Sequence, residues 1–126
     1  MSFKEISTGL QHIGIPTNDI EATVAFYAAL GFETAYRTVN NGEEVAFLQL
    51  GDLMLETYQN GKALHRLGAV DHVAINVTDV EEARRLAEEM KLRIIEEGQL
   101  PYWTNGVKYF IVLGPNDEKV EFNQYL

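Results

Sequence analysis

The sequence predicts an α+β protein that consists of two βαβββ modules in tandem. Two observations support this prediction. Residues 10–33 align with residues 70–93 at an offset of 60 positions, with His12 on His72 and apolar residues on apolar residues. Within each copy, the hydrophobic residues follow first the period of a strand, then that of a helix, then that of strands again. An internal repeat of this length indicates a duplicated fold.

The first copy is expected to start with an apolar strand at residues 9–15, followed by a helix that ends near Leu30. Asn18 and Glu21 have the spacing of a capping box, in which an oxygen-bearing side chain precedes a glutamate by three residues. Gly31 suits the end of this helix. The apolar stripe of the helix consists of Ile20, Val24 and Tyr27. Three strands are expected to follow, at residues 33–39, 43–50 and 53–58.

The second copy repeats this order. A strand is expected at residues 70–77, and Thr78 and Glu81 again have capping-box spacing before a helix that ends near Met90. The apolar stripe of this helix consists of Val80, Ala83, Leu86 and Ala87. Three further strands are expected at residues 92–97, 107–113 and 119–124.

The later strands of the two copies also align. Phe47 falls on Phe110 at an offset of 63, and Glu56 falls on Glu121 at an offset of 65. This difference predicts that the last hairpin turn is two residues longer in the second copy.

The two modules span residues 8–58 and 70–124, and the linker between them, residues 59–69, contains two glycines. A chain of 126 residues is long enough for one ordinary domain and too short for two. We therefore expect residues 1–126 to form a single domain.

Composition excludes several functions. Acidic residues outnumber basic ones 19 to 10, and the net charge of −9 argues against binding to nucleic acid or to an anionic membrane. The chain has no cysteine, so disulfides, cysteine zinc sites and thiol nucleophiles are excluded. No apolar run is long enough to span a membrane, and the first nine residues lack the apolar core of a signal peptide. A cytoplasmic protein is expected.

Two histidines and two glutamates occupy corresponding places in the two copies, His12 and Glu56 in the first and His72 and Glu121 in the second. Alternation along the strands places them on the face opposite the branched apolar residues. Charged groups on such a face are costly unless they are paired or bind a metal. Two imidazoles and two carboxylates suit Zn²⁺, Ni²⁺, Mn²⁺, Co²⁺ or Fe²⁺, so one divalent metal ion is the expected cofactor.

At these residues the chain resembles the vicinal oxygen chelate superfamily, which includes glyoxalase I, methylmalonyl-CoA epimerase, extradiol dioxygenases and the bleomycin- and fosfomycin-resistance proteins. The resemblance covers nearly the whole chain and rests on the segments LQHIGIPTNDIEATVAFY, FLQLGDLMLETY, VDHVAINVTDVEEA and VLGPNDEKVEFNQ. It implies βαβββ modules whose mixed sheets curl around a central metal cavity. It also implies a homodimer, as in many members, sometimes with each site shared between chains.

Compact bacterial glyoxalase I, a lactoylglutathione lyase, resembles this chain at all four expected metal ligands. The resemblance implies a lyase or isomerase that moves a proton next to a carbonyl through an enediolate bound to the metal. Glu121 or Glu56 would be the catalytic base, and the resemblance favours Glu121. Asn60 stands where the bacterial enzymes contact glutathione, whereas Pro16 stands where they have an arginine. A substrate other than a glutathione adduct therefore stays open.

Further residues expected around a small-molecule substrate are aromatic or basic: Tyr58, Phe47, Trp103 and Lys108. Three alternative functions stay open. A protein of the bleomycin-resistance type would bind a drug without catalysis. An epimerase of the methylmalonyl-CoA type has glutamine at the position of Glu56. An iron-dependent ring-cleaving dioxygenase uses two histidines and one carboxylate.

Overall fold

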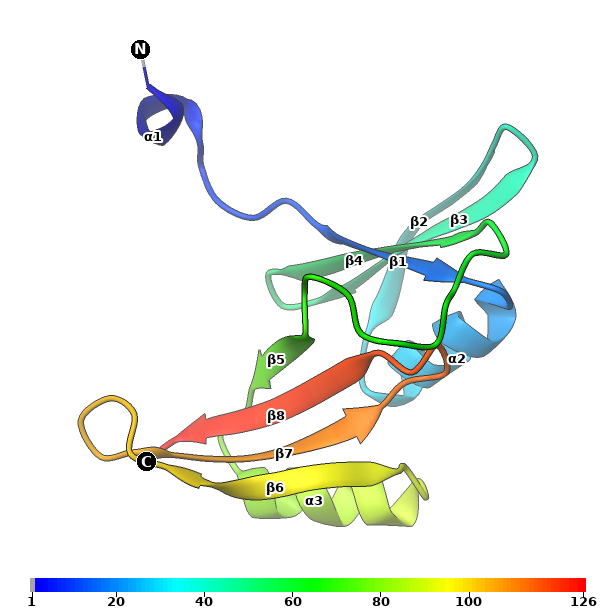
Figure 1. Ribbon diagram of the computed structural model, residues 1–126. Coiled ribbons are helices and arrows are strands. Elements are labelled where there is room, and N and C mark those ends of the chain that lie inside the picture. The colour runs from blue at the N-terminus through cyan, green and yellow to red at the C-terminus, as the bar shows by residue number, and fades with distance from the viewer. Residues whose placement is uncertain (1) are drawn as a thin grey trace. The chain divides into compact units, whose positions relative to one another are not determined.

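The computed structural model describes residues 2–126. The chain divides into two compact units, and the boundary between them along the sequence lies between Ala63 and Leu64. The elements of the first unit are α1 (Phe3–Ile6), β1 (Ile13–Thr17), α2 (Ile20–Ala29), β2 (Glu33–Asn40), β3 (Glu43–Leu50) and β4 (Leu53–Gln59). Its strands form one sheet in the order β1-β4-β3-β2, in which β1 runs parallel to β4 and the other neighbours are antiparallel. Helix α2 packs against β2, β3 and β4 (Figure 1).

The second unit repeats this arrangement. Its elements are β5 (His72–Asn76), α3 (Val80–Glu89), β6 (Ile94–Leu100), β7 (Val107–Leu113) and β8 (Lys119–Tyr125). The strand order is β5-β8-β7-β6, again with only the first pair parallel, and α3 packs against β7 and β8 (Figure 1). The predicted α+β class and the tandem βαβββ order are thus confirmed. Helix α1 is an addition that the repeat does not predict.

The predicted helix starts are wrong by one residue. The N-caps are Asp19 and Asp79, whose carboxylates accept hydrogen bonds from the backbone N–H groups of Ala22 and Glu82 at 3.1 and 3.0 Å. A carboxylate is an effective cap because it is both a strong acceptor and an anion at the positive end of the helix dipole. Asn18 instead binds the backbone of Ala63, at the end of the first unit.

The predicted helix ends near Leu30 and Met90 are confirmed. Gly31 has a φ of 103°, and the next residue donates back to the Tyr27 carbonyl at 3.0 Å, which closes the helix in a left-handed turn. In the second unit Lys91 takes the equivalent position with a φ of 57°. Leu92 then donates to the Ala87 carbonyl at 3.0 Å, so it belongs to the helix end. For this reason β6 begins at Ile94 and not at residue 92.

The predicted apolar stripes of the two helices agree only in part with the residues that are buried. Thr23 is fully buried in α2, because its hydroxyl forms a buried hydrogen bond of 2.9 Å with Thr17 of β1, whereas Val24 is only partly buried. In α3, Leu86 is 44% exposed within the described part of the chain, although it was expected to pack on the sheet.

Strand pairing corrects the alignment of the later strands. Phe47 lies opposite Glu56, whereas Ile111, and not Phe110, lies opposite Glu121. The hairpin segment from Ile111 to Glu121 is therefore one residue longer than the equivalent segment from Phe47 to Glu56, and the other extra residues lie in the loop before β7. The bulges near Tyr36 and Glu96 keep the offset of 60 positions.

Strand β1 begins at Ile13 and not at residue 9, so His12 precedes the strand. Gly9 has a φ of 136°, which breaks the expected extended run. Among residues 2–126, no helix is both long and apolar enough to cross a membrane.

Candidate metal centre

Each sheet has one face covered by its helix and a second face, called the site face below, that carries the polar groups. In the first unit, Thr17 contacts α2 through Thr23, which places the alternating residues Ile15 and Ile13 on the helix side. Leu55 lies beside Ile13 and is 1% exposed. The alternate residues, His12 and Gly14 at β1 and Glu56 and Tyr58 on β4, therefore belong to the site face.

In the first unit the histidine and the glutamate meet. The Nε2 atom of His12 lies 3.4 Å from Oε1 of Glu56, and the two side chains are 34% and 27% exposed. The other ring nitrogen, Nδ1, is hydrogen bonded to the side-chain oxygen of Gln11 at 2.9 Å. The edge of the ring packs on Phe47, with the ring centroids 5.8 Å apart. The His12 ring is thus held from two sides and turns Nε2 toward the carboxylate.

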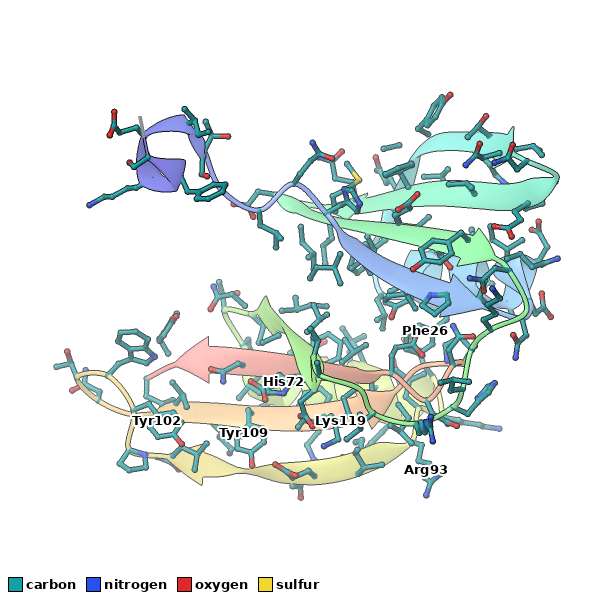
Figure 2. The ribbon with its side chains drawn as sticks, turned by 45° about the horizontal axis from the view of Figure 1, so that its top comes forward. Phe26, His72, Arg93, Tyr102, Tyr109 and Lys119 are labelled. Atoms are coloured by element: carbon teal, nitrogen blue, oxygen red, sulfur yellow. The ribbon has the colours of Figure 1, made fainter. Side chains whose placement is uncertain are left out.

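The second unit forms the same pair. His72 Nε2 lies 3.7 Å from Oε1 of Glu121, whose side chain is only 12% exposed. His72 Nδ1 is hydrogen bonded to the carboxylate of Asp71 at 2.8 Å, and Lys119 lies 3.5 Å from the same oxygen. The hydrogen bond from His72, aided by Lys119, lowers the pKa of Asp71 below its usual value. Figure 2 shows His72 and Lys119 on neighbouring strands of this sheet.

The arrangement fixes which ring nitrogen is available in each pair. A carboxylate or amide oxygen only accepts hydrogen bonds, so Nδ1 carries the proton in both histidines. In the neutral ring, Nε2 then presents a lone pair to a carboxylate oxygen. A proton or a cation between two acceptors that face each other at 3.4 and 3.7 Å stabilises the pair.

A divalent cation fits these donors. Two atoms that each lie about 2.1 Å from one cation are separated by roughly 3.0–3.4 Å at ordinary ligand angles. The separation in the first unit lies within this range, and that in the second unit is slightly longer. A histidine that ligates a metal through one nitrogen usually donates its other N–H to an oxygen, as His12 and His72 do here.

Each unit supplies a pair of donors, which we call a half-site: His12 with Glu56, and His72 with Glu121. Among residues 2–126, no group of three histidine, aspartate or glutamate side chains is placed to hold a metal ion. The structure thus brings each predicted histidine to its predicted glutamate. The assembly of all four side chains stays a prediction.

The site face of the second unit contains two polar residues that the repeat does not indicate. Asn123 donates to Oε2 of Glu121 at 2.9 Å. Tyr109, opposite Asn123 in the strand register, donates its hydroxyl to Glu96 at 2.7 Å. This hydrogen bond, with some burial and the negative charge of Glu96, raises the pKa of Tyr109 to about 12. Neither residue has a counterpart of the same type in the first copy, which is why a search by repetition misses them.

The expected substrate residues lie in different surroundings. Phe47 contacts His12, and the Tyr58 ring lies over Gly14, so both belong to the site face of the first unit. Asn60 uses its side-chain oxygen to accept a hydrogen bond from the Lys62 backbone at 3.0 Å, in a turn after β4.

Trp103 and Lys108 are not brought to the half-site of the second unit. Trp103 is 75% exposed in the loop before β7 and packs edge-on against Tyr125. Lys108 forms an ion pair with Glu81 of α3 and therefore lies on the helix side of the sheet. Lys108 was expected at the site because it is basic, and charge alone does not indicate the face of a strand residue. In the register it lies opposite Gln124, whose side chain reaches the start of α3 on the helix side.

Comparisons with known proteins agree with the fold. Residues 9–122 match the Glyoxalase/Bleomycin resistance protein/Dioxygenase superfamily. The uncharacterized protein YwbC of Bacillus subtilis is 34% identical over 122 residues, which cover 91% of this chain and 96% of YwbC.

Two solved structures show the same architecture. Lactoylglutathione lyase from Agrobacterium tumefaciens aligns with a TM-score of 0.71 at 20% identity, over 94% of this chain and 95% of that chain. The fosfomycin resistance protein FosX from Listeria monocytogenes aligns with a TM-score of 0.78 at 15% identity, over 96% of each chain. At such low identities these likenesses concern the fold, which hosts several chemistries. The match over residues 9–122, together with the YwbC relationship, shows that the chain belongs to the Glyoxalase/Bleomycin resistance protein/Dioxygenase superfamily, also called the vicinal oxygen chelate superfamily.

Proposed function

We propose that this protein is a divalent-metal-dependent lyase or isomerase of the glyoxalase I type. In this proposal the enzyme isomerises its substrate by moving a proton from a carbon next to a carbonyl to the neighbouring carbon. The observation that carries the proposal is the repeated half-site, in which histidine Nε2 and glutamate Oε1 face each other in both units. Two half-sites together supply two nitrogens and two oxygens, and their two carboxylates balance the charge of a divalent ion.

The four donors are His12, Glu56, His72 and Glu121, and they converge on one cation either within a chain or across a homodimer. When bound, a divalent cation acts as a Lewis acid toward substrate oxygens and stabilises negative charge that develops there. The histidines act as neutral ligands, because their Nδ1 protons are committed to Gln11 and Asp71. We further propose that the working form is a cytoplasmic homodimer.

The chemical step belongs to the carboxylates. Glu121 takes the proton from the hydroxyl-bearing carbon next to the carbonyl and returns it to the carbonyl carbon, while the hydroxyl proton passes to the former carbonyl oxygen. The step is an isomerisation, so no external oxidant or reductant is needed. Glu56 is the second candidate for this role. The resemblance to glyoxalase I supports Glu121.

The substrate class is an α-hydroxy or α-keto carbonyl compound, because such a compound offers two neighbouring oxygens. Pro16 of β1 occupies the place where bacterial glyoxalase I has an arginine. Proline has no side-chain donor, so a carboxylate such as that of glutathione loses a bidentate partner here. Phe47 and Tyr58 offer an apolar wall on the site face instead. Asn60, in the turn after β4, is proposed as a further substrate contact.

The proposal is tested by turnover of methylglyoxal with glutathione and with other thiols, after the protein is loaded with Ni²⁺, Zn²⁺, Mn²⁺ or Co²⁺. We expect metal-dependent isomerisation that the variant Glu121→Gln loses while it keeps most of its metal. A Glu121→Gln variant with the activity of the parent would reject the role of this residue as the base. A parent protein that binds none of these ions would reject the metal-dependent function itself.

A further inference from the structure

The two half-sites hold their glutamates differently. In the second unit, Asn123 Nδ2 donates to Oε2 of Glu121 at 2.9 Å, while the other oxygen, Oε1, faces His72 Nε2 at 3.7 Å. In the first unit, the described residues give Glu56 one polar side-chain partner, His12, at 3.4 Å. Glu56 is also more exposed than Glu121, at 27% against 12%. The second carboxylate is therefore anchored at one oxygen, and the first is not.

The strand register explains this difference. Tyr58 follows Glu56 by two residues on β4, as Asn123 follows Glu121 on β8, so the two occupy equivalent places. Gly14 lies beside Glu56 in the register, and its missing side chain leaves room for the Tyr58 ring. A Cβ atom on Gly14 would lie 3.2 Å from the Tyr58 hydroxyl oxygen.

The second unit has a larger residue at the position of Gly14. Ala74 lies beside Glu121 in the register, at the place of Gly14, and a Cβ atom at that place closely approaches a tyrosine ring positioned as that of Tyr58. A short amide side chain fits beside this methyl group and reaches the carboxylate. The chain thus combines glycine with tyrosine in one half and alanine with asparagine in the other.

No other side chain supplies this hydrogen bond within residues 2–126. Tyr109 lies opposite Asn123 but donates its hydroxyl to Glu96 at 2.7 Å. Lys119, two residues before Glu121, pairs with Asp71 at 3.5 Å. Asn123 is therefore the donor on which the orientation of the Glu121 carboxylate depends.

We propose that Asn123 is a positioning residue for Glu121, which holds Oε2 so that Oε1 alone is presented to the cation. This inference rests on the proposed function, since it assumes that Glu121 is a metal ligand. A carboxylate that is oriented before the cation arrives loses less conformational freedom on binding. Attachment through a single oxygen also leaves one more coordination position for the substrate.

The test measures metal binding in the absence of substrate. Ni²⁺ is titrated calorimetrically into the metal-free parent and into the variants Asn123→Ala and Asn123→Leu, of which the second keeps the number and branching of the side-chain heavy atoms of asparagine but has no donor. Both variants are expected to bind Ni²⁺ about 10- to 100-fold more weakly, as is usual when a partner of a ligand is removed. Asn76→Ala is the matched control, because Asn76 lies beside Asn123 in the register, and within residues 2–126 the polar side-chain partners of Glu121 are Asn123 and His72. This control is expected to bind as the parent does.

A second measurement separates positioning from a general loss of stability. The visible absorption of bound Co²⁺ depends on the number and arrangement of its ligands, and a change in global stability does not alter it. We expect the Asn123 variants to change this spectrum and Asn76→Ala to preserve it. Unchanged Ni²⁺ affinity and an unchanged Co²⁺ spectrum in both Asn123 variants would overturn the inference and leave the proposed function standing. A parent protein that binds neither ion would overturn the proposed function as well.

Discussion

Tyr109 is the residue on the site face of the second unit whose ionisation the fold changes most clearly. Tyr109 is labelled in Figure 2. Its hydroxyl donates to the Glu96 carboxylate, which raises the pKa of Tyr109 to about 12. A raised pKa in an acid means that the fold favours the neutral phenol. The stabilisation is therefore complete below the unfolded pKa of about 10 and is lost as the pH rises toward 12.

The first prediction concerns this titration. In an absorbance titration at the phenolate band, the folded parent is expected to show an ionisation near pH 12 that Tyr109→Phe lacks, with circular dichroism used to verify the fold at each pH. Persistence of this late ionisation in Tyr109→Phe would contradict the assignment.

The second prediction concerns two buried threonines of the first unit. The hydroxyl oxygen of Thr57 has no hydrogen-bond partner within residues 2–126, whereas the hydroxyl of Thr17 contacts Thr23 and the backbone of Asp19. Thr57→Val removes an unsatisfied polar group and should raise the free energy of unfolding by about 1 kcal/mol. Thr17→Val should lower it by about 1–2 kcal/mol. Urea denaturation measures both, and equal effects of the two substitutions would argue against this difference.

The helix caps show that the sequence pattern predicts the presence of each helix but not its exact first residue. The capping-box spacing predicted a helix in each copy but placed its start one residue too early. In the first copy two neighbouring residues, Asn18 and Asp19, can both cap a helix. Asn18 does not cap the helix, because its side chain forms hydrogen bonds with the backbone of Ala63, 45 residues later. Only the tertiary structure contains that contact.

The third prediction tests the caps. Asp19→Ala and Asp79→Ala should each lower the free energy of unfolding by about 1 kcal/mol, because each removes a hydrogen bond to a helix N–H group. Thr78→Ala, at the start predicted from the spacing, is the control and should change stability by less than about 0.5 kcal/mol. These values are measured by urea denaturation. A larger loss for Thr78→Ala than for Asp79→Ala would mean that the helix begins one residue earlier.

Strand register is the element-level feature that the repeat predicted least well. The alignment of Phe47 with Phe110 matched like with like, but hydrogen bonding places Ile111 at the equivalent position. Similar hydrophobic residues on adjacent positions of β7 give no signal for the choice, and a shift of one residue exchanges the two faces.

At the scale of the whole molecule, duplication made the fold and the four candidate ligands predictable. His12 and His72, with Glu56 and Glu121, are visible because each has a counterpart in the other copy. Asn123 is not visible in this way, since it acts in one half only. Asp71 is not visible because its counterpart in the first copy, Gln11, is a different type of residue. Because Asn123 binds Glu121, the carboxylate of the second half-site is held at one more point than that of Glu56. Such a difference between the two halves is seen only in the three-dimensional structure.

The central claim is that the two half-sites hold one cation together. The most direct test is a calorimetric titration of Ni²⁺ into the metal-free parent and into two double variants, His12→Ala with Glu56→Ala and His72→Ala with Glu121→Ala. If both half-sites hold the same cation, the parent binds one Ni²⁺ per chain and either double variant loses tight binding. Two cations per chain in the parent, with one retained at full affinity in each double variant, would contradict this claim.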